Sequence, residues 1–147
     1  MNHTAYDVMR EYMIEGAELD GPYQFPMMPR YTGRPGADTV DFKDSFDRRI
    51  KNHRDLTVNF YIHDNEFEKI WNCPDKYIEH LKCFNSVIAP DFSMAVGEGG
   101  MPFAMNIWQK YRNHAIAHYL HMNGIRMIPN VNIPPEYCLS LIHISEP

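Results

Sequence analysis

The clearest pattern in the sequence is an alternation of short apolar runs with longer segments of helical periodicity. The runs over 56–62, 86–89 and 125–128 are too short for helices and are rich in β-branched, aromatic or other apolar residues. Each run ends in a polar or proline-containing turn. We therefore predict three buried strands.

The segments between these runs carry the signals of helices. One helix places Phe67 and Ile70 on its apolar side until Pro74 interrupts it, and a second helix begins at that proline. The longest helix is predicted from Pro102 to about Asn123. Its apolar residues, which we expect to face the core, are Ala104, Ile107, Trp108, Tyr111, Ala115, Tyr119 and Met122.

The order strand, helix, strand, helix, strand predicts an α/β protein built from parallel β-α-β units. Upstream, the density of proline and glycine over 20–36 excludes a helix and leaves room for one short extended piece. We predict a short helix over 4–15, a short strand over 37–42 and a short helix over 44–49.

The last nine residues, 139–147, match one translated frame of a widely used transposon sequencing adapter. We expect them to be a non-native tail that takes no part in the fold. The remaining residues, 1–138, are then expected to form a single, incomplete α/β domain whose gene continues beyond this point.

The charge of the chain bears on its partners. The net charge is −5, whereas a general nucleic-acid binder needs a basic field to neutralise phosphates. Nucleic acid is therefore a partner that the net charge does not support. The densest basic cluster could still make a local contact with nucleic acid, although a solvated helix end is the simpler interpretation of this cluster. The cluster comprises Arg48, Arg49, Lys51, His53 and Arg54.

The cysteines and the hydropathy indicate a compartment. Cys73, Cys83 and Cys138 form no CxxC pair, and the charged N-terminal residues exclude a secretory signal peptide. No window approaches the roughly 18 apolar residues of a membrane helix. We expect a cytoplasmic protein with free thiols and no membrane partner.

Polar residues stand at the carboxyl ends of all three predicted strands, where parallel α/β proteins bind ligands. Asp64 and Asp91 could act as general acid and base, or as oxygen ligands of a divalent metal. Ser93 and Asn130 could orient a sugar, a phosphate or an amide of a small-molecule ligand. The alternative is that these residues are helix caps and turn formers.

Three histidines form a second candidate site. His114, His118 and His121 lie on one side of the longest predicted helix, and three imidazoles with an open position suit zinc. The stripe lacks the glutamate of a metalloprotease motif. Partly buried, hydrogen-bonded histidines are the more common explanation of such a stripe.

Several motifs in this order and spacing resemble the family called domain of unknown function 4417, found in bacteria and phages. They are Phe60-Tyr61-Ile62-His63-Asp64, Phe67-Glu68, Trp71, Pro90-Asp91-Phe92-Ser93, Met101-Pro102, Trp108, Tyr111-Arg112 and Gly124-Ile125 to Ile128-Pro129. The family-like core covers 56–133. The resemblance implies a partial or complete β/α barrel, here truncated, that is often carried on mobile elements. Carried over by motif, the site positions are Asp64, Asp91, Ser93 and Arg112.

Three functions remain open at this point. The leading hypothesis is a small-molecule-binding or hydrolytic α/β domain with a polar site at the strand ends, since paired carboxylates suit glycosidic or phosphoester hydrolysis. The alternative is a non-enzymatic accessory protein of a mobile element that binds nucleic acid or protein. The third is a fragment without function, because an incomplete barrel leaves strand edges unpaired.

Overall fold

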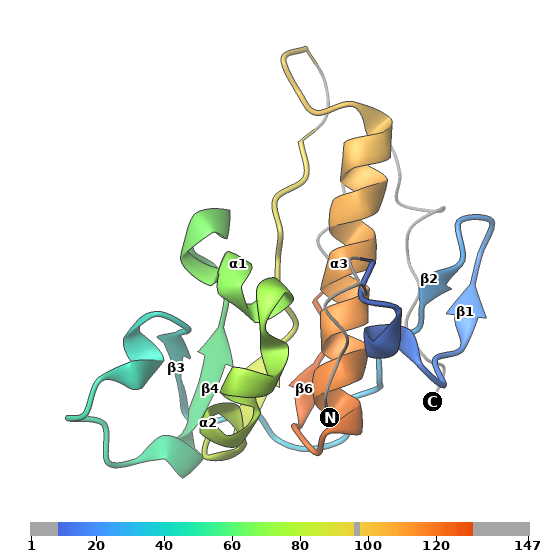
Figure 1. The fold of residues 1–147 in the computed structure, drawn as a ribbon. Helices are drawn as coiled ribbons and strands as arrows, with labels where there is room; N and C mark the ends of the chain where they lie inside the picture. The colour runs from blue at the N-terminus through green and yellow to red at the C-terminus, as the bar shows by residue number, and fades with distance from the viewer. Residues whose placement is uncertain (1–8, 96–97, 131–147) are drawn as a thin grey trace.

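A computed structural model describes residues 9–95 and 98–130 of the chain (Figure 1). Its centre is a sheet of four parallel strands, β3 (Asp38–Asp41), β4 (Leu56–Asn59), β5 (Ser86–Ile88) and β6 (Met127–Ile128). The strands neighbour one another in chain order, and each pair is parallel. This sheet confirms the predicted α/β class. Closure into a barrel stays a prediction.

Helical segments connect the strands. Between β3 and β4 lie the 3-10 turns η2 (Asp44–Phe46) and η3 (His53–Asp55). Between β4 and β5 lie α1 (Asp64–Asn72), η4 (Pro74–Tyr77) and α2 (Ile78–Lys82). The helix α3 (Phe103–Met122) returns the chain from β5 to β6. The helices were predicted correctly around Pro74 and after Pro102, because proline fixes where a helix begins.

The N-terminal part of the described chain packs beside α3 (Figure 1). It comprises a 3-10 turn, η1 (Glu11–Ile14), and an antiparallel pair, β1 (Leu19–Asp20) with β2 (Phe25–Pro26). The described part of the helix predicted over 4–15 is only this turn. Arg10 before it and Gly16 after it both adopt positive φ, which ends helical geometry on either side.

A row of phenylalanines forms the core beneath the carboxyl ends of the strands. Phe42 follows β3, Phe60 follows β4 and Phe92 lies after β5, while Phe67 belongs to α1; all four are buried. The ring centroids are 5.0 Å apart for Phe42 and Phe60, 5.4 Å for Phe60 and Phe67, and 4.6 Å for Phe67 and Phe92. The row ties together the segments that leave three neighbouring strands.

The face that α3 buries agrees with the predicted one at Ala115 and Tyr119, which are buried, and differs from it elsewhere. Trp108 and Met122 are 39% and 62% exposed, whereas the polar residues Asn106, Gln109 and Asn113 are buried. The prediction from helical periodicity failed at these positions because the three amides bind backbone groups of the loop between β5 and α3. Hydrophobic periodicity does not register such partners.

Within the described residues, no helix has the length and apolarity needed to cross a membrane. The predicted tail, 139–147, lies outside the described residues.

Candidate functional site

A groove opens at the carboxyl ends of the first three strands of the sheet, and we call it the rim groove. Its volume is about 430 Å³. Its lining residues are Lys43, Phe60, Tyr61, Ile62, His63, Glu66, Asp91 and Ser93. Lys43 follows β3, the run from Phe60 to His63 follows β4, and Asp91 and Ser93 follow β5. The groove thus gathers side chains from three consecutive strand ends.

One side of the rim groove is a charge pair. Lys43 Nζ lies 3.0 Å from Glu66 Oε1, and the backbone N–H of His63 donates to Glu66 Oε2 at 3.2 Å. The hydrogen bond from Lys43, followed by smaller effects, lowers the pKa of Glu66, and the same bond raises the pKa of Lys43. Both groups therefore stay charged at neutral pH. Glu66 was not among the site residues predicted from the sequence.

Tyr61 and Asp91 also line the rim groove. Tyr61 is 59% exposed, and Asp91 is half-buried. Burial of part of the phenol raises the pKa of Tyr61, and the charge of Asp91 raises it further. The phenol therefore stays protonated and can donate a hydrogen bond beside a carboxylate.

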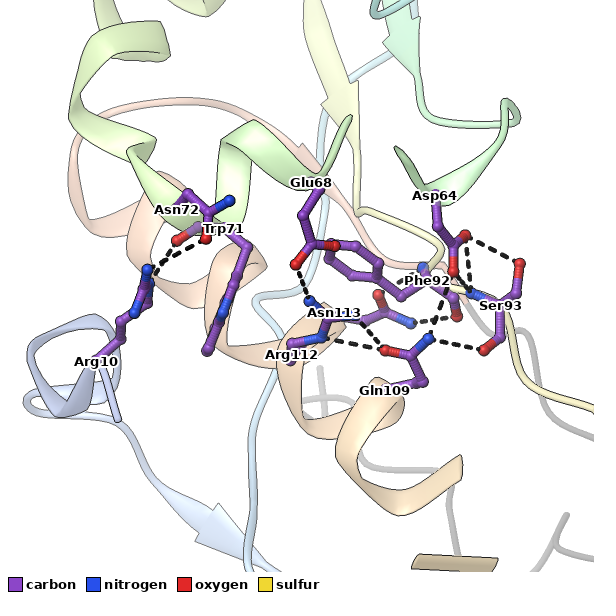
Figure 2. Close-up of polar contacts among 10 residues, drawn as sticks. All are labelled: Arg10, Asp64, Glu68, Trp71, Asn72, Phe92, Ser93, Gln109, Arg112 and Asn113. Atoms are coloured by element: carbon purple, nitrogen blue, oxygen red, sulfur yellow. Dashed lines mark hydrogen bonds and ion pairs between the residues drawn. The ribbon is translucent and has the colours of Figure 1, made fainter. Parts of the chain in front are cut away.

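Asp64 binds the loop after β5 rather than lining the groove (Figure 2). Its carboxylate accepts the backbone N–H of Ser93, at 3.1 Å from both oxygens, and the Ser93 hydroxyl at 2.9 Å. Gln109 Nε2 lies 3.4 Å from the same carboxylate and donates to Ser93 O at 3.1 Å. Asp64 therefore fixes Ser93 to the start of α1.

Arg112 supports this loop from below (Figure 2). Its guanidinium lies 3.7 Å from the centroid of the Phe92 ring and 2.7 Å from Glu68 Oε1. It also donates to Gln109 Oε1, with Nε at 3.1 Å and Nη2 as a second donor. Arg112 is buried and does not line the rim groove. Its contact with the Phe92 ring holds the residue that lies between Asp91 and Ser93 in the chain.

Two asparagines of α3 complete the support of the loop. Asn113 accepts the Phe92 N–H at 2.8 Å and donates to Phe92 O at 3.4 Å. Asn106 accepts the Ala95 N–H at 3.0 Å and donates to Ala95 O at 2.9 Å. Sequence reasoning missed these residues. The sequence feature that could have revealed them is a polar stripe at 106, 109 and 113, whose spacing places three amides on one face of a helix.

The remaining predicted site residues lie apart from the rim groove. Asn130, after β6, is half-buried, and its Nδ2 is buried without a hydrogen-bond partner among the described residues. His114 Nδ1 lies 2.6 Å from Pro26 O, and His118 Nδ1 lies 3.0 Å from Met13 O. His121 is exposed. In the described ranges, no cluster of three His, Cys, Asp or Glu side chains could hold a metal ion.

The two buried histidines instead attach the N-terminal segment to α3. The basic cluster runs from the segment after η2 into η3. Arg48, Lys51 and Arg54 are exposed in it, and Arg49 lies 2.8 Å from Asp47. The cluster leads into the amino end of β4, whereas the rim groove lies at the carboxyl ends of β3, β4 and β5.

Comparison with known proteins agrees with the motifs at the strand ends. The family profile named Domain of unknown function (DUF4417) matches residues 17–138, which include all the rim-groove residues. The chain belongs to this family.

Phage proteins are among the relatives of this DUF4417 chain. It is 30% identical over 83 residues to the Gene 1 protein of Mycobacterium phage L5, covering 52% of this chain and 35% of that protein. It is 28% identical over 72 residues to the Gene 1 protein of Mycobacterium phage D29, covering 49% of this chain and 26% of that protein. The matches thus span about a third or less of these relatives. No solved structure matches the chain.

Proposed function

We propose that the rim groove binds a small polyhydroxylated molecule, such as a sugar or a sugar phosphate, and that the protein hydrolyses a glycosidic or phosphoester bond in it. One observation carries the proposal. Side chains that follow three neighbouring strands, Lys43, His63 and Asp91, converge on one groove. Parallel α/β proteins bind their ligands at this edge of the sheet.

The chemistry of the lining favours a ligand rich in hydroxyl groups. Lys43 and the Tyr61 phenol donate hydrogen bonds, whereas Glu66 and Asp91 accept them. A hydroxyl group both donates and accepts, so a polyol can satisfy this mixed lining. The exposed ring of Tyr61 adds a flat apolar surface for the carbon face of a sugar ring.

The residues divide into those that touch the ligand and those that position them. In the proposal, Asp91 is the general acid or base, and Ser93 accepts a hydrogen bond from the ligand while it donates to Asp64. Asp64 and Arg112 act as positioning residues, since their contacts hold Ser93 and Phe92. A divalent metal would bind through the groove carboxylates together with oxygens of the ligand.

A ligand panel tests the proposal. Aldose and ketose sugars, their phosphates and simple phosphoesters are titrated into the protein, with and without Mg²⁺, and binding is read from backbone amide shifts in NMR. We expect at least one class to shift Tyr61, His63 and Ser93, and Asp91→Asn to abolish that response. The matched control is Asp55→Asn, the same change before β4 at the opposite edge of the sheet, which should leave binding unchanged.

The hydrolytic part of the proposal has its own readout. Nitrophenyl glycosides and nitrophenyl phosphates are incubated with the protein, and release of nitrophenol is followed. We expect turnover by the wild type that Asp91→Asn removes and Asp55→Asn retains. Binding of a sugar without turnover of any of these substrates would indicate a binding protein and reject the hydrolase.

We place the function in the cytoplasm, which the exposed free thiols of Cys73 and Cys83 support.

Nucleic-acid binding is the second candidate, and the exposed side chains of Arg48, Lys51 and Arg54 on one connection favour it. Such binding weakens steeply with salt, because phosphate contacts release counterions. A duplex DNA that binds the wild type in low salt, but not the variant with all three residues changed to Gln, would support this function. Salt-independent binding of a sugar or sugar phosphate in the rim groove would support the first candidate function.

A further inference from the structure

A separate hollow lies at the edge of the sheet opposite to the rim groove, and we call it the amino-edge pocket. Its volume is about 270 Å³. Residues 30–33 and 124–127 line it together with His121. Residues 124–126 lead into β6, and this loop lies at the lower end of the view in Figure 1. The strands are parallel, so the pocket lies at their amino ends and the rim groove at their carboxyl ends.

The charged side chains of the amino-edge pocket are basic. Arg30 and Arg126 line it, and no aspartate or glutamate does so among the described residues. Neither arginine forms an ion pair in the described part of the chain. Like charges that line one pocket repel each other, whereas an anion is attracted by both. The pocket thus concentrates positive charge in a chain whose net charge is −5.

Arg126 is held in place by the segments around it. Its Nη2 donates to Tyr31 Oη at 3.1 Å, and its guanidinium lies 5.4 Å from the centroid of the Tyr31 ring. The Tyr31 hydroxyl donates in turn to Arg34 O at 2.6 Å. The backbone oxygen of Arg126 accepts the Val87 N–H at 2.8 Å. A guanidinium has five N–H donors, so Arg126 keeps donors for a ligand.

Gly33 allows this guanidinium to lie against the backbone. A Cβ atom at residue 33 would lie 1.8 Å from Arg126 Nη2, so any side chain there would displace the guanidinium. The lack of a side chain at Gly33 is therefore part of how the pocket places its arginine.

A smaller hollow of about 50 Å³ adjoins the amino-edge pocket and shares residues 124–126 with it. Its other basic lining residues are Arg54, which precedes β4, and Lys82, which ends α2 before β5. Lys82 Nζ lies 3.4 Å from the exposed Glu79, and no carboxylate lines this hollow in the described ranges. Basic residues from the amino ends of three neighbouring strands thus line two adjoining hollows.

We propose that the amino-edge pocket binds a phosphate group through Arg30 and Arg126, and that the adjoining hollow takes a second, neighbouring phosphate. Guanidinium groups bind phosphate oxygens through paired, charge-assisted hydrogen bonds. A small-molecule diphosphate and the backbone of a nucleic acid both carry successive phosphates. The inference goes beyond the proposed function and does not depend on it, because the rim groove lies at the other edge of the sheet.

The test titrates the full chain with inorganic pyrophosphate and follows backbone amide shifts by NMR. We expect saturable shifts at Gly33, Gly124 and Arg126, with a Kd in the millimolar range. The amides of Tyr61 and Ser93 report the rim groove in the same spectra. Failure of this proposal and failure of the proposed function are therefore read from different residues.

Two substitutions separate the charge of the pocket from its geometry. Arg126→Gln should weaken pyrophosphate binding about tenfold, because it removes a charged, paired donor. Gly33→Ala keeps every charge but displaces the guanidinium, and it should weaken binding about threefold. Circular dichroism verifies that each variant folds.

Arg34→Gln is the matched control, since Arg34 is exposed on the same segment and lines neither hollow. It should leave the Kd unchanged. Equal losses in Arg34→Gln and Arg126→Gln would overturn the proposal, because a diffuse positive field would then explain the binding. No shift at Gly33 and Arg126 with about 10 mM pyrophosphate would also overturn it.

Competition identifies the source of the phosphates once pyrophosphate is bound. Displacement by a nucleoside diphosphate, with a DNA oligonucleotide inactive, would support the site and indicate a small-molecule ligand. Displacement by the oligonucleotide in low salt, lost as NaCl rises from about 0.05 M to about 0.5 M, would support the site and indicate a nucleic-acid backbone.

Discussion

The two faces of the first half of α3 reverse the usual relation between polarity and burial. On one face, Asn106, Gln109 and Asn113 are buried because each makes hydrogen bonds to the loop after β5. On the other face, Ile107 and Trp108 stand in an open groove. Buried amides of this kind replace the secondary structure that the loop lacks, so polarity inside the fold marks where a loop is held.

This comparison separates two tasks of one helix. The buried polar face fixes Phe92 and, with it, the two groove residues beside that ring, Asp91 and Ser93. On the apolar face, Trp108 meets the core residue Trp71 edge to face, with the ring centroids 5.6 Å apart. Changes on the polar face should therefore alter stability and the rim groove more than changes on the apolar face do.

The largest effect is expected from Asn113→Ala. The substitution removes two hydrogen bonds and leaves the Phe92 N–H and C=O buried without partners, which should lower the free energy of unfolding by about 3 kcal/mol. Equilibrium unfolding in urea measures this loss. The exposed Asn52 gives the control, and Asn52→Ala should change stability by less than about 0.5 kcal/mol. Equal effects of the two variants would refute the account of the polar face.

The next largest effect on the free energy of unfolding is expected at Lys110, where removal of the charge should raise stability. Lys110 is buried and lies between Asn106 and Asn113 in the sequence of α3, and burial lowers its pKa to about 8. Because the unfolded chain keeps the ordinary pKa of 10.5, the unfolded state holds more protons between these values. Stability should therefore rise with pH from about 8 to about 10.5, by up to about 3 kcal/mol.

Lys110→Met should remove this rise and stabilise the protein by about 1–3 kcal/mol at neutral pH, because it deletes a buried charge. Urea unfolding of both proteins across this pH range measures the difference. Lys51→Met, at an exposed position, is the control and should keep the pH dependence. A wild type whose stability does not change over this range would contradict the burial of the charge.

Asp64→Ala should have a smaller effect, since Ser93 is exposed and water can replace the lost partner. We expect a loss of about 1 kcal/mol in the free energy of unfolding, together with faster hydrogen exchange at the Ser93 amide. Glu79→Ala, which removes another exposed carboxylate, should leave that amide unchanged. An unaltered exchange rate in Asp64→Ala would show that Asp64 does not hold the loop.

Ile107→Ser should have the smallest effect on stability, about 0.5 kcal/mol or less, because the residue lies in the open groove. Equilibrium unfolding in urea measures this change. A large loss of stability in Ile107→Ser would mean that the apolar stripe belongs to the core.

The sheet could be predicted from the sequence because its signals are local. Short apolar runs, Pro74 and Pro102 mark the elements, and the strand ends bring Asp64, Asp91 and Ser93 to one edge of the sheet. The N-terminal pair β1–β2 could be predicted only in part. β2 lies where the sequence leaves room for one short extended piece, whereas β1 has only two residues and gives no signal of its own.

The roles of the rim residues could be predicted only in part. A carboxylate at a strand end looks the same in sequence whether it lines a groove or binds a loop, and here Asp91 does the first and Asp64 the second. Lys43 and Glu66 escaped prediction because their pairing joins elements 23 residues apart in the chain. The faces of α3 escaped it because a helical wheel registers the polarity of side chains and not their partners.

The central claim is that the loop held by α3 presents Asp91 and Ser93 to a ligand in the rim groove. An NMR titration of the wild-type chain with the sugar and sugar-phosphate panel tests it most directly. The account predicts saturable shifts confined to the segments that follow β3, β4 and β5, with loss of the response in Asp91→Asn. Shifts that fall elsewhere, or a response that Asp91→Asn leaves intact, would contradict it.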